Sequence, residues 1–228
     1  MKLLALDTSS LACTVAVSRD GTVYEQHEEQ ERAHTRLLVP MIRAALDEAG
    51  LALAELDAIV LGNGPGSFIG MRIAASVTEG LAFGAGLPVV PVSSMAAVAA
   101  DVGETGDIVC VAQDAHMQEV YLGLYERSAA GLARPLREEC LQGQARIAEL
   151  AHYAPGIAAG FGWQRYPELR ELNADQFVFV SDQYYPRASA LLRLGAAAFA
   201  AGQQISPAEI EPAYLRQTVA QKPAASVS

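Results

Sequence analysis

The stretch from residue 57 to residue 86, DAIVLGNGPGSFIGMRIAASVTEGLAFGAG, constrains the fold more than any other part of the chain. It predicts a buried strand over 57–62, a glycine-rich turn over 62–66 and, without a break, a long helix. Glycine reaches positive φ without steric cost and proline presets its own φ, so GNGPG is typical of a tight turn. Ser67, directly after the turn, is expected to cap the helix through its hydroxyl.

The helix predicted over 70–85 is apolar over most of its circumference. Ile73, Val77 and Leu81 recur at helical spacing. Small residues occupy most of the other positions, and the polar residues form one narrow stripe. Such a helix is normally buried on more than one side. We therefore expect a sheet on one side and a second partner on the other, and the identity of that partner decides the function.

Composition excludes some classes of function. The chain has 228 residues, enough for one large domain or two modest ones with a real core. Its 16 Lys and Arg against 26 Asp and Glu give a net charge of −10, and no cluster of basic residues is visible. Phosphate contacts supply most of the affinity for nucleic acids, so strong direct RNA binding by this chain alone is not expected.

The cysteines and histidines do not form a metal-binding pattern. Cys13, Cys110 and Cys140 are far apart, and the four histidines include no pair at HxxH or HxxxH spacing. We expect reduced, buried thiols and no metal site. The opening apolar run is too short for a signal peptide, and no segment approaches the roughly 20 apolar residues of a membrane span. A cytoplasmic protein without membrane contact is expected.

Hydrophobic periodicity predicts further elements on both sides of the glycine-rich unit. The second half is less clearly patterned than the first. In the first half the predicted elements are strands over 2–7, 12–18, 22–28 and 89–92, and helices over 34–49 and 94–100. In the second half they are strands over 108–114 and near 135–141, a short helix over 144–151 and a helix over 188–201.

The chain repeats its own opening. An apolar strand leads into Asp114 as another leads into Asp7, and in both places a short turn and a second strand follow. This repeat indicates an internally duplicated α/β fold. The polar segment DVGETGD separates the copies, which predicts subdomains over 1–103 and 104–228. The tail from residue 206 is expected to pack back on the first subdomain.

A weak nucleotide site is one interpretation of the two strand ends. The Asp7 carboxylate could hold a metal-bound nucleotide, with Ser9 reaching phosphate oxygens; the alternative is an Asx turn that closes a hairpin. Gly64 and Gly66 precede a helix N-terminus that could hold a phosphate. GNGPGSFIG, however, matches neither GxGxxG nor GxxxxGK[ST], which favours a structural turn. Asp114 is the matching position in the second half, and no residue is predicted to be catalytic.

Six segments in this order and spacing resemble the TsaB family, also called YeaZ: LLALDTSSLACTVAV, AHTRLLVPMI, LGNGPGSFIGMRIA, VPVSSMAA, VAQDAHMQEVYLGLY and EPAYLR. The resemblance covers nearly the whole chain. It implies the duplicated actin-like ATPase fold, which is ribonuclease H-like, with two subdomains that each contain a mixed sheet flanked by helices. That fold would account for the matched hairpins.

The resemblance also implies a function. TsaB proteins are the non-catalytic partners of TsaD, which works with TsaB and the ATPase TsaE. TsaD transfers a threonylcarbamoyl group from threonylcarbamoyl-AMP to the adenosine beside the anticodon of tRNAs that read codons beginning with A. TsaD-type relatives hold a metal through paired histidines on the first helix, where this chain has His34 followed by Leu38. The chain is therefore expected to have no cofactor of its own, with ATP or ADP bound at the junction with TsaD, and to meet tRNA only through the complex.

The expected interface consists of the helices over 34–49 and 70–85, each with an outward apolar face. Matching helices of TsaD would complete a four-helix contact, and without TsaD the same surface would form a two-fold homodimer. The expected contact residues are Leu37, Leu38, Met41, Ala45, Met71, Ala75 and Thr78, with Arg72 as a polar anchor.

Three positions depart from the family pattern: Ile69, His116 and Gln221. The first two weaken the case for anion binding by their loops. The main alternative function is a small ATP-dependent kinase or ATPase of the actin-like fold, acting through Asp7 and the glycine-rich turn. A metal-free protease is a third idea, for which the sequence shows no Ser/His/Asp arrangement.

Overall fold

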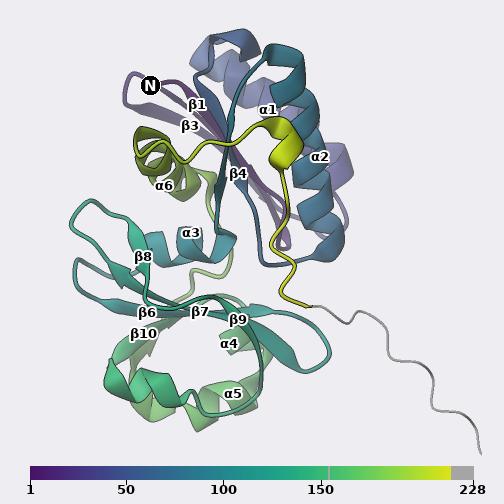
Figure 1. The fold of residues 1–228 in the computed structure, drawn as a ribbon. Helices are drawn as coiled ribbons and strands as arrows, with labels where there is room; N and C mark the ends of the chain where they lie inside the picture. The colour runs from purple at the N-terminus through teal and green to yellow at the C-terminus, as the bar shows by residue number, and fades with distance from the viewer. Residues whose placement is uncertain (154, 217–228) are drawn as a thin grey trace, which may run out of the picture.

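The computed structural model describes residues 1–153 and 155–216, which form two halves that are each built on one sheet (Figure 1). The first sheet has the strand order β3-β2-β1-β4-β5. Its first three strands form an antiparallel meander, and β4 and β5 run parallel to β1, so the sheet is mixed. The strands are β1 (Leu3–Asp7), β2 (Ala12–Arg19), β3 (Thr22–Glu29), β4 (Ala58–Gly62) and β5 (Val89–Val92).

The second sheet repeats the first strand for strand. Its order, β8-β7-β6-β10-β11, has the same sequence of antiparallel and parallel pairings, and β9 pairs additionally with β7. The predicted duplication is confirmed. The strands are β6 (Ile108–Asp114), β7 (Glu119–Arg127), β8 (Ala133–Pro135), β9 (Cys140–Gly143), β10 (Gly156–Ala159) and β11 (Phe177–Val180).

Helices cover both faces of each sheet. α1 (His34–Ala49) and α2 (Phe68–Ala85) lie on the outer face of the first sheet, and the short α4 (Gly162–Arg165) and α5 (Pro167–Leu172) accompany the second. α3 (Ser94–Ala100) and α6 (Ala188–Ala200) lie between the sheets (Figure 1). Single 3-10 turns occupy Leu53–Glu55, Ala148–His152, Ala174–Gln176 and Pro207–Glu209.

The last helix of each half packs on the other half's sheet. α3 follows the first sheet in the chain but packs on β6, β7 and β8, whereas α6 follows the second sheet and packs on β1, β2, β4 and β5. A division of the chain between residues 103 and 104 therefore separates each of these helices from the sheet that it covers. One central cluster of buried side chains, which includes Met95 and Leu191, joins both sheets.

Several local predictions for the first half are confirmed. α1 ends at Gly50, which has φ of 62°, and the Ser67 hydroxyl accepts a hydrogen bond from the Gly70 N–H at 3.2 Å. Pro40 lies within α1, where its ring is exposed to solvent.

The second half was predicted less well. The strand expected near 135–141 is two separate strands, β8 and β9, and the helix expected over 144–151 is the 3-10 turn at Ala148–His152. β10, β11, α4 and α5 were not predicted. Each of these four has only four to six residues, too few for a periodic pattern to be recognised.

Among the described residues, no helix combines the length and the apolarity needed to cross a membrane.

The packing of α6 on the first sheet predicts opposite effects for one substitution at two helical glycines. A Cβ on Gly195 would overlap the Val60 side chain of β4, whereas a Cβ on Gly80 of α2 would meet nothing within 4 Å. Gly195→Ala should lower the free energy of unfolding by about 1–3 kcal/mol through overpacking. Gly80→Ala should raise it by about 0.5–1 kcal/mol through helix propensity. Urea denaturation measures both, and equal effects would contradict the close contact.

Candidate functional site

The outer surface of α1 and α2 exposes several large apolar side chains, most of them on α2, among polar residues such as Arg43 and Glu79. These helices lie on the face of the first sheet opposite α6 (Figure 1). Exposed fractions are 41% for Val39, 42% for Phe68, 70% for Ile69 and 83% for Phe83. Exposed apolar surface of this kind on two adjacent helices is typical of a protein–protein contact.

Most of the residues predicted to face outward on these helices instead face inward. Leu38, Met41, Ala45, Met71 and Thr78 are buried in the chain's own core, so their expected outward orientation is wrong. A charge at Met71 would therefore disturb folding and would not test an interface.

The remaining predicted contact residues lie at or near the surface. Leu37 and Ala75 are half-buried at the edge of the core, and Arg72 is exposed. The error on α2 has a steric cause: the stripe that faces the sheet consists of the small residues Gly70, Ala74, Thr78 and Ala82, which allow close approach. The larger Ile73, Val77 and Leu81 are only half-buried.

A groove of about 420 Å³ runs between α1 and α2. Its walls combine apolar side chains with hydroxyls, one histidine and one arginine. Such a groove can receive the side chains of a helix laid across the surface. The lining residues are His34, Thr35, Leu38, Val39, Phe68, Ile69, Arg72, Ile73, Ser76 and Val77.

The Asp7 carboxylate is buried and accepts hydrogen bonds from two separate segments of the chain, so it is not accessible to a ligand. Asp7 is fully buried. Its Oδ1 accepts hydrogen bonds from the Ser9 N–H at 2.7 Å and the Ser9 hydroxyl at 2.8 Å, and its Oδ2 accepts one from the Ser94 hydroxyl. The Ser94 Oγ in turn accepts from the Gly64 N–H at 2.9 Å. The turn after β1, the glycine-rich turn and α3 are thus joined at one buried carboxylate.

Gly66 of the turn and Gly70 of α2 lie directly against the backbone after β1. A Cβ on Gly66 would overlap the Ser9 carbonyl oxygen, and a Cβ on Gly70 would overlap the Thr8 carbonyl oxygen. The Ser67 N–H donates to that same Ser9 oxygen at 2.6 Å, and the Thr8 hydroxyl donates to the Gly70 carbonyl at 2.7 Å. This arrangement is the structural turn favoured by the sequence.

Asp114 occupies the matching position of the second half but is partly exposed. Its Oδ1 accepts from the His116 N–H at 2.8 Å and from the Tyr166 hydroxyl at 2.7 Å. Burial, together with the hydrogen bond to Asp114, raises the pKa of Tyr166 to about 12. The turn from β6 to β7 contains three consecutive non-glycine residues at positive φ, namely His116, Met117 and Gln118, at 59°, 54° and 63°.

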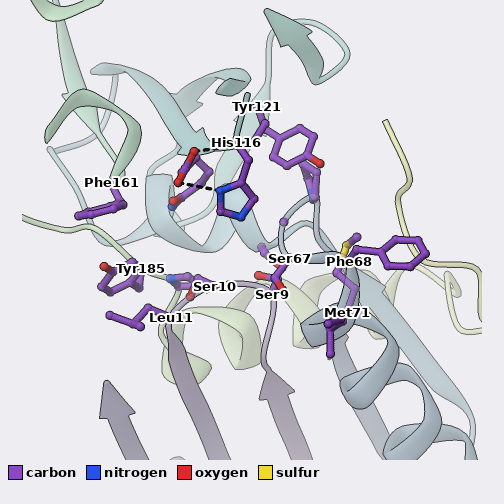
Figure 2. Close-up of a pocket in the computed structure, with 18 of the residues that line it drawn as sticks. Ser9, Ser10, Leu11, Ser67, Phe68, Met71, His116, Tyr121, Phe161 and Tyr185 are labelled. Atoms are coloured by element: carbon purple, nitrogen blue, oxygen red, sulfur yellow. Dashed lines mark hydrogen bonds and ion pairs between the residues drawn. The ribbon is translucent and has the colours of Figure 1, made fainter. Parts of the chain in front are cut away.

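A cleft of about 750 Å³ is lined by residues of both halves. Figure 2 shows His116 and Tyr121 of the second half facing Ser9, Ser10 and Ser67 of the first half across it. Most of the lining is apolar or aromatic. The cleft also contains Leu11, Glu31, Arg32, Pro65, Gly66, Phe68, Ile69, Met71, Ser94, Gln113, Asp114, Ala115, Met117, Phe161, Tyr185, Pro186, Tyr214 and Arg216.

Residues 205–216, here called the C-terminal strap, run from the first half to the mouth of this cleft (the end of the coloured chain in Figure 1). Ile205 forms an antiparallel bridge with Val89. The Asn63 carbonyl accepts from the Ala213 N–H at 3.0 Å, and the Asn63 side-chain amide donates to the Glu211 carbonyl at 2.9 Å.

The strap contains the EPAYLR segment noted in the sequence. The Arg72 Nε donates to the Tyr214 hydroxyl at 3.0 Å, and the Arg72 guanidinium lies 3.8 Å from the centroid of the Phe68 ring. Arg216 pairs with Glu119 at 2.7 Å in the second half. Arg72, expected to be a partner anchor, thus also holds the strap. Gln221 lies outside the described residues.

The cysteines and potential metal ligands are dispersed. Cys13 and Cys110 are buried, Cys140 is half-buried, and all three thiols are free. Burial raises the pKa of Cys13 to about 12 and raises that of Cys110 as well. In the part of the chain that the structure describes, no three His, Cys, Asp or Glu side chains gather as a metal site would require.

Comparison with known proteins identifies the family. Residues 22–223 match the family model described as "TsaD: tRNA N6-adenosine threonylcarbamoyltransferase". The chain is 34% identical over 226 residues to the tRNA threonylcarbamoyladenosine biosynthesis protein TsaB of Escherichia coli, covering 97% of each protein. It is 36% identical over 232 residues to TsaB of Haemophilus influenzae, covering 97% of this chain and 96% of that protein. The chain belongs to the TsaB family.

The fold agrees with this assignment. The solved structure titled "YeaZ from Pseudomonas aeruginosa" superimposes with a TM-score of 0.84 at 37% identity, covering 94% of this chain and 99% of that one. The two mixed sheets with flanking helices confirm the duplicated actin-like ATPase fold predicted from the TsaB resemblance.

Sequence reasoning missed the exposed members of the α1–α2 surface. Val39, Phe68 and Phe83 were not among its candidates, and Ile69 was noted only as a departure from the family pattern. One signal was available on α2: Ile69 and Phe83 lie on the side of that helix opposite its small-residue stripe.

The buried Asp7 carboxylate predicts a pH effect on stability. Burial raises its pKa above the ordinary value of 3.8, although hydrogen bonds from Ser94 and Ser9 oppose the shift. The folded protein therefore binds more protons than the unfolded chain just above pH 3.8, and the stability contributed by this group falls as pH rises through that window. Each pKa unit corresponds to about 1.4 kcal/mol. The free energy of unfolding of the natural protein, minus that of Asp7→Asn, should therefore fall between pH 4 and pH 7. Urea titrations in which this difference stays constant or rises with pH would contradict the prediction.

Proposed function

We propose that this chain is the non-catalytic subunit that binds and activates TsaD in tRNA threonylcarbamoyladenosine biosynthesis. TsaD would transfer the threonylcarbamoyl group. The present chain would supply a surface that binds TsaD and would supply no reacting groups. The names of the TsaB relatives support the pathway. The observation that carries the partner role is the set of exposed apolar side chains on α1 and α2, with Ile69 near the beginning of α2 and Phe83 near its end.

Contact between this surface and two helices of TsaD would bury side chains that are now exposed. An interface of standard size buries about 1,600 Å² in total. Ile69 and Val39 flank the groove between the helices. Arg72 lies in its wall and is exposed, although its Nε already donates to Tyr214. Without TsaD, the same surface can pair with a second copy as a homodimer.

The other components follow from the same proposal. The ATPase TsaE would act on the assembled complex, and ATP or ADP would bind at the junction with TsaD. tRNA would contact this chain only indirectly, which agrees with its net charge of −10. A complex that modifies tRNA places the protein in the cytoplasm.

The interface predicts a selective loss of binding. Ile69→Asp and Val39→Asp each place a charge on an exposed apolar residue, so folding should be retained while affinity for TsaD falls about a hundredfold, as for a central interface residue. Val178→Asp is the matched control, because Val178 is 67% exposed on β11 in the second half. Isothermal titration with TsaD of the same organism measures the affinities. Unchanged binding by both interface variants would refute the proposal.

The kinase or ATPase alternative is tested with the same protein. The Asp7 carboxylate is buried, and the Gly64 and Ser67 N–H groups already donate within the chain. Titration of the isolated chain with ATP and magnesium should therefore give weak binding or none. A dissociation constant in the micromolar range would favour an enzyme of the actin-like fold.

A further inference from the structure

We infer that the partner-binding surface does not end at α2 but continues across the mouth of the cleft, over Tyr214 of the C-terminal strap, to Met117 of the second half. This inference rests on the proposed function, because the occupant is the same partner that covers α1 and α2. It adds a contact in the second half, where neither the sequence nor the family comparison places one.

Continuity of exposed apolar side chains supports the extension. Ile69 is 70% exposed, Phe68 and Tyr214 are each 42% exposed, and Met117 is 60% exposed. The Phe68 and Tyr214 rings pack with centroids 5.5 Å apart. All four residues line the cleft, and Phe68 and Ile69 also line the groove between α1 and α2. The two depressions therefore share a wall, and a partner seated in the groove reaches the cleft mouth.

The strap holds the two ends of this surface together. At one end the Tyr214 hydroxyl accepts from Arg72 of α2. At the other end Arg216 donates to the Ala115 carbonyl at 3.0 Å, pairs with Glu119 at 2.7 Å and approaches the Met117 sulfur at 3.8 Å. Only one residue separates Tyr214 from Arg216, so α2 and the turn after β6 are held in a nearly fixed relation. A surface that is ordered before binding loses less conformational entropy when the partner arrives.

The conformation of the turn also favours a role for Met117. It is the central member of three consecutive non-glycine residues at positive φ, which ordinary side chains seldom adopt. The Met117 side chain gains nothing from burial, because it is exposed, and it does not favour the positive φ of its own backbone. Residues held in sparsely populated backbone regions concentrate at functional sites. Methionine is also adaptable enough to fit an irregular partner surface.

Met117→Asn tests the inference, because asparagine tolerates positive φ but removes the apolar side chain. Gln118→Asn is the matched control: it lies in the same turn, has the same backbone conformation and exchanges one polar side chain for another. With TsaD as the titrant, Met117→Asn should bind about tenfold more weakly, and Gln118→Asn should bind like the natural protein. Equal affinities for the two variants would overturn the inference.

Two further measurements separate the possible failures. Ile69→Asp, measured in parallel, tests the proposed function: if it weakens binding while Met117→Asn does not, the partner occupies α2 alone. If neither variant weakens binding, the proposed function itself fails. Hydrogen exchange on the natural complex does not depend on any variant's folding, and it should show new protection over residues 115–119 and 213–216. Exchange unchanged there, with protection on α2, would overturn the extension.

Discussion

The close approach of α2 to the turn after β1 is the constraint on which the first half depends. Gly66 and Gly70 lie against the Ser9 and Thr8 carbonyls, with no space for a Cβ. Once these backbones touch, only small side chains fit between α2 and the sheet, and the larger apolar residues of the helix must lie to the sides or outside. The exposed surface that includes Ile69 and Phe83 is thus a consequence of how α2 packs. At the same contact the Ser67 N–H donates to the Ser9 carbonyl, so this part of the glycine-rich turn is bonded within the chain.

The two halves are joined because α3 and α6 each pack on the sheet of the half to which they do not belong in sequence. Each helix fills the space between the sheets but packs on the sheet of the other half, so a single core spans both. The faces of the two sheets that point toward each other are covered by this core. The opposite face of the first sheet is covered by α1 and α2. The C-terminal strap adds a second connection at the cleft mouth through Tyr214 and Arg216. Both connections join the two halves, which suits the proposed role of presenting a preformed surface to a partner.

Much of the first half could be predicted because its elements are long and carry strong local signals. The helix over 34–49 has the observed bounds, and the hydroxyl of Ser67 caps α2 as expected. The repeat around Asp7 and Asp114 is a pattern of the same kind, and it indicates the duplication of the sheets. The short elements of the second half gave no periodic signal. Contact residues on α1 and α2 were assigned to the wrong side because a large apolar residue such as Met71 was expected to face a partner. In the structure the small residues of α2 face the sheet, and Met71 is buried against Gly64 of the glycine-rich turn.

By itself, the sequence determined the fold class, the family and the presence of a helix too apolar to be covered by one sheet. These properties depend on local patterns and on the order of motifs, which are encoded along the chain. Only the tertiary structure decided which side of α2 faces outward, that Asp7 is buried and hydrogen-bonded, and that Tyr214 and Arg216 join α2 to the turn at Met117. Those outcomes depend on contacts between residues far apart in the chain, such as Arg72 and Tyr214, which are 142 positions apart. Helical phase and burial at such contacts are set by the shape of the opposing backbone, which no local pattern records.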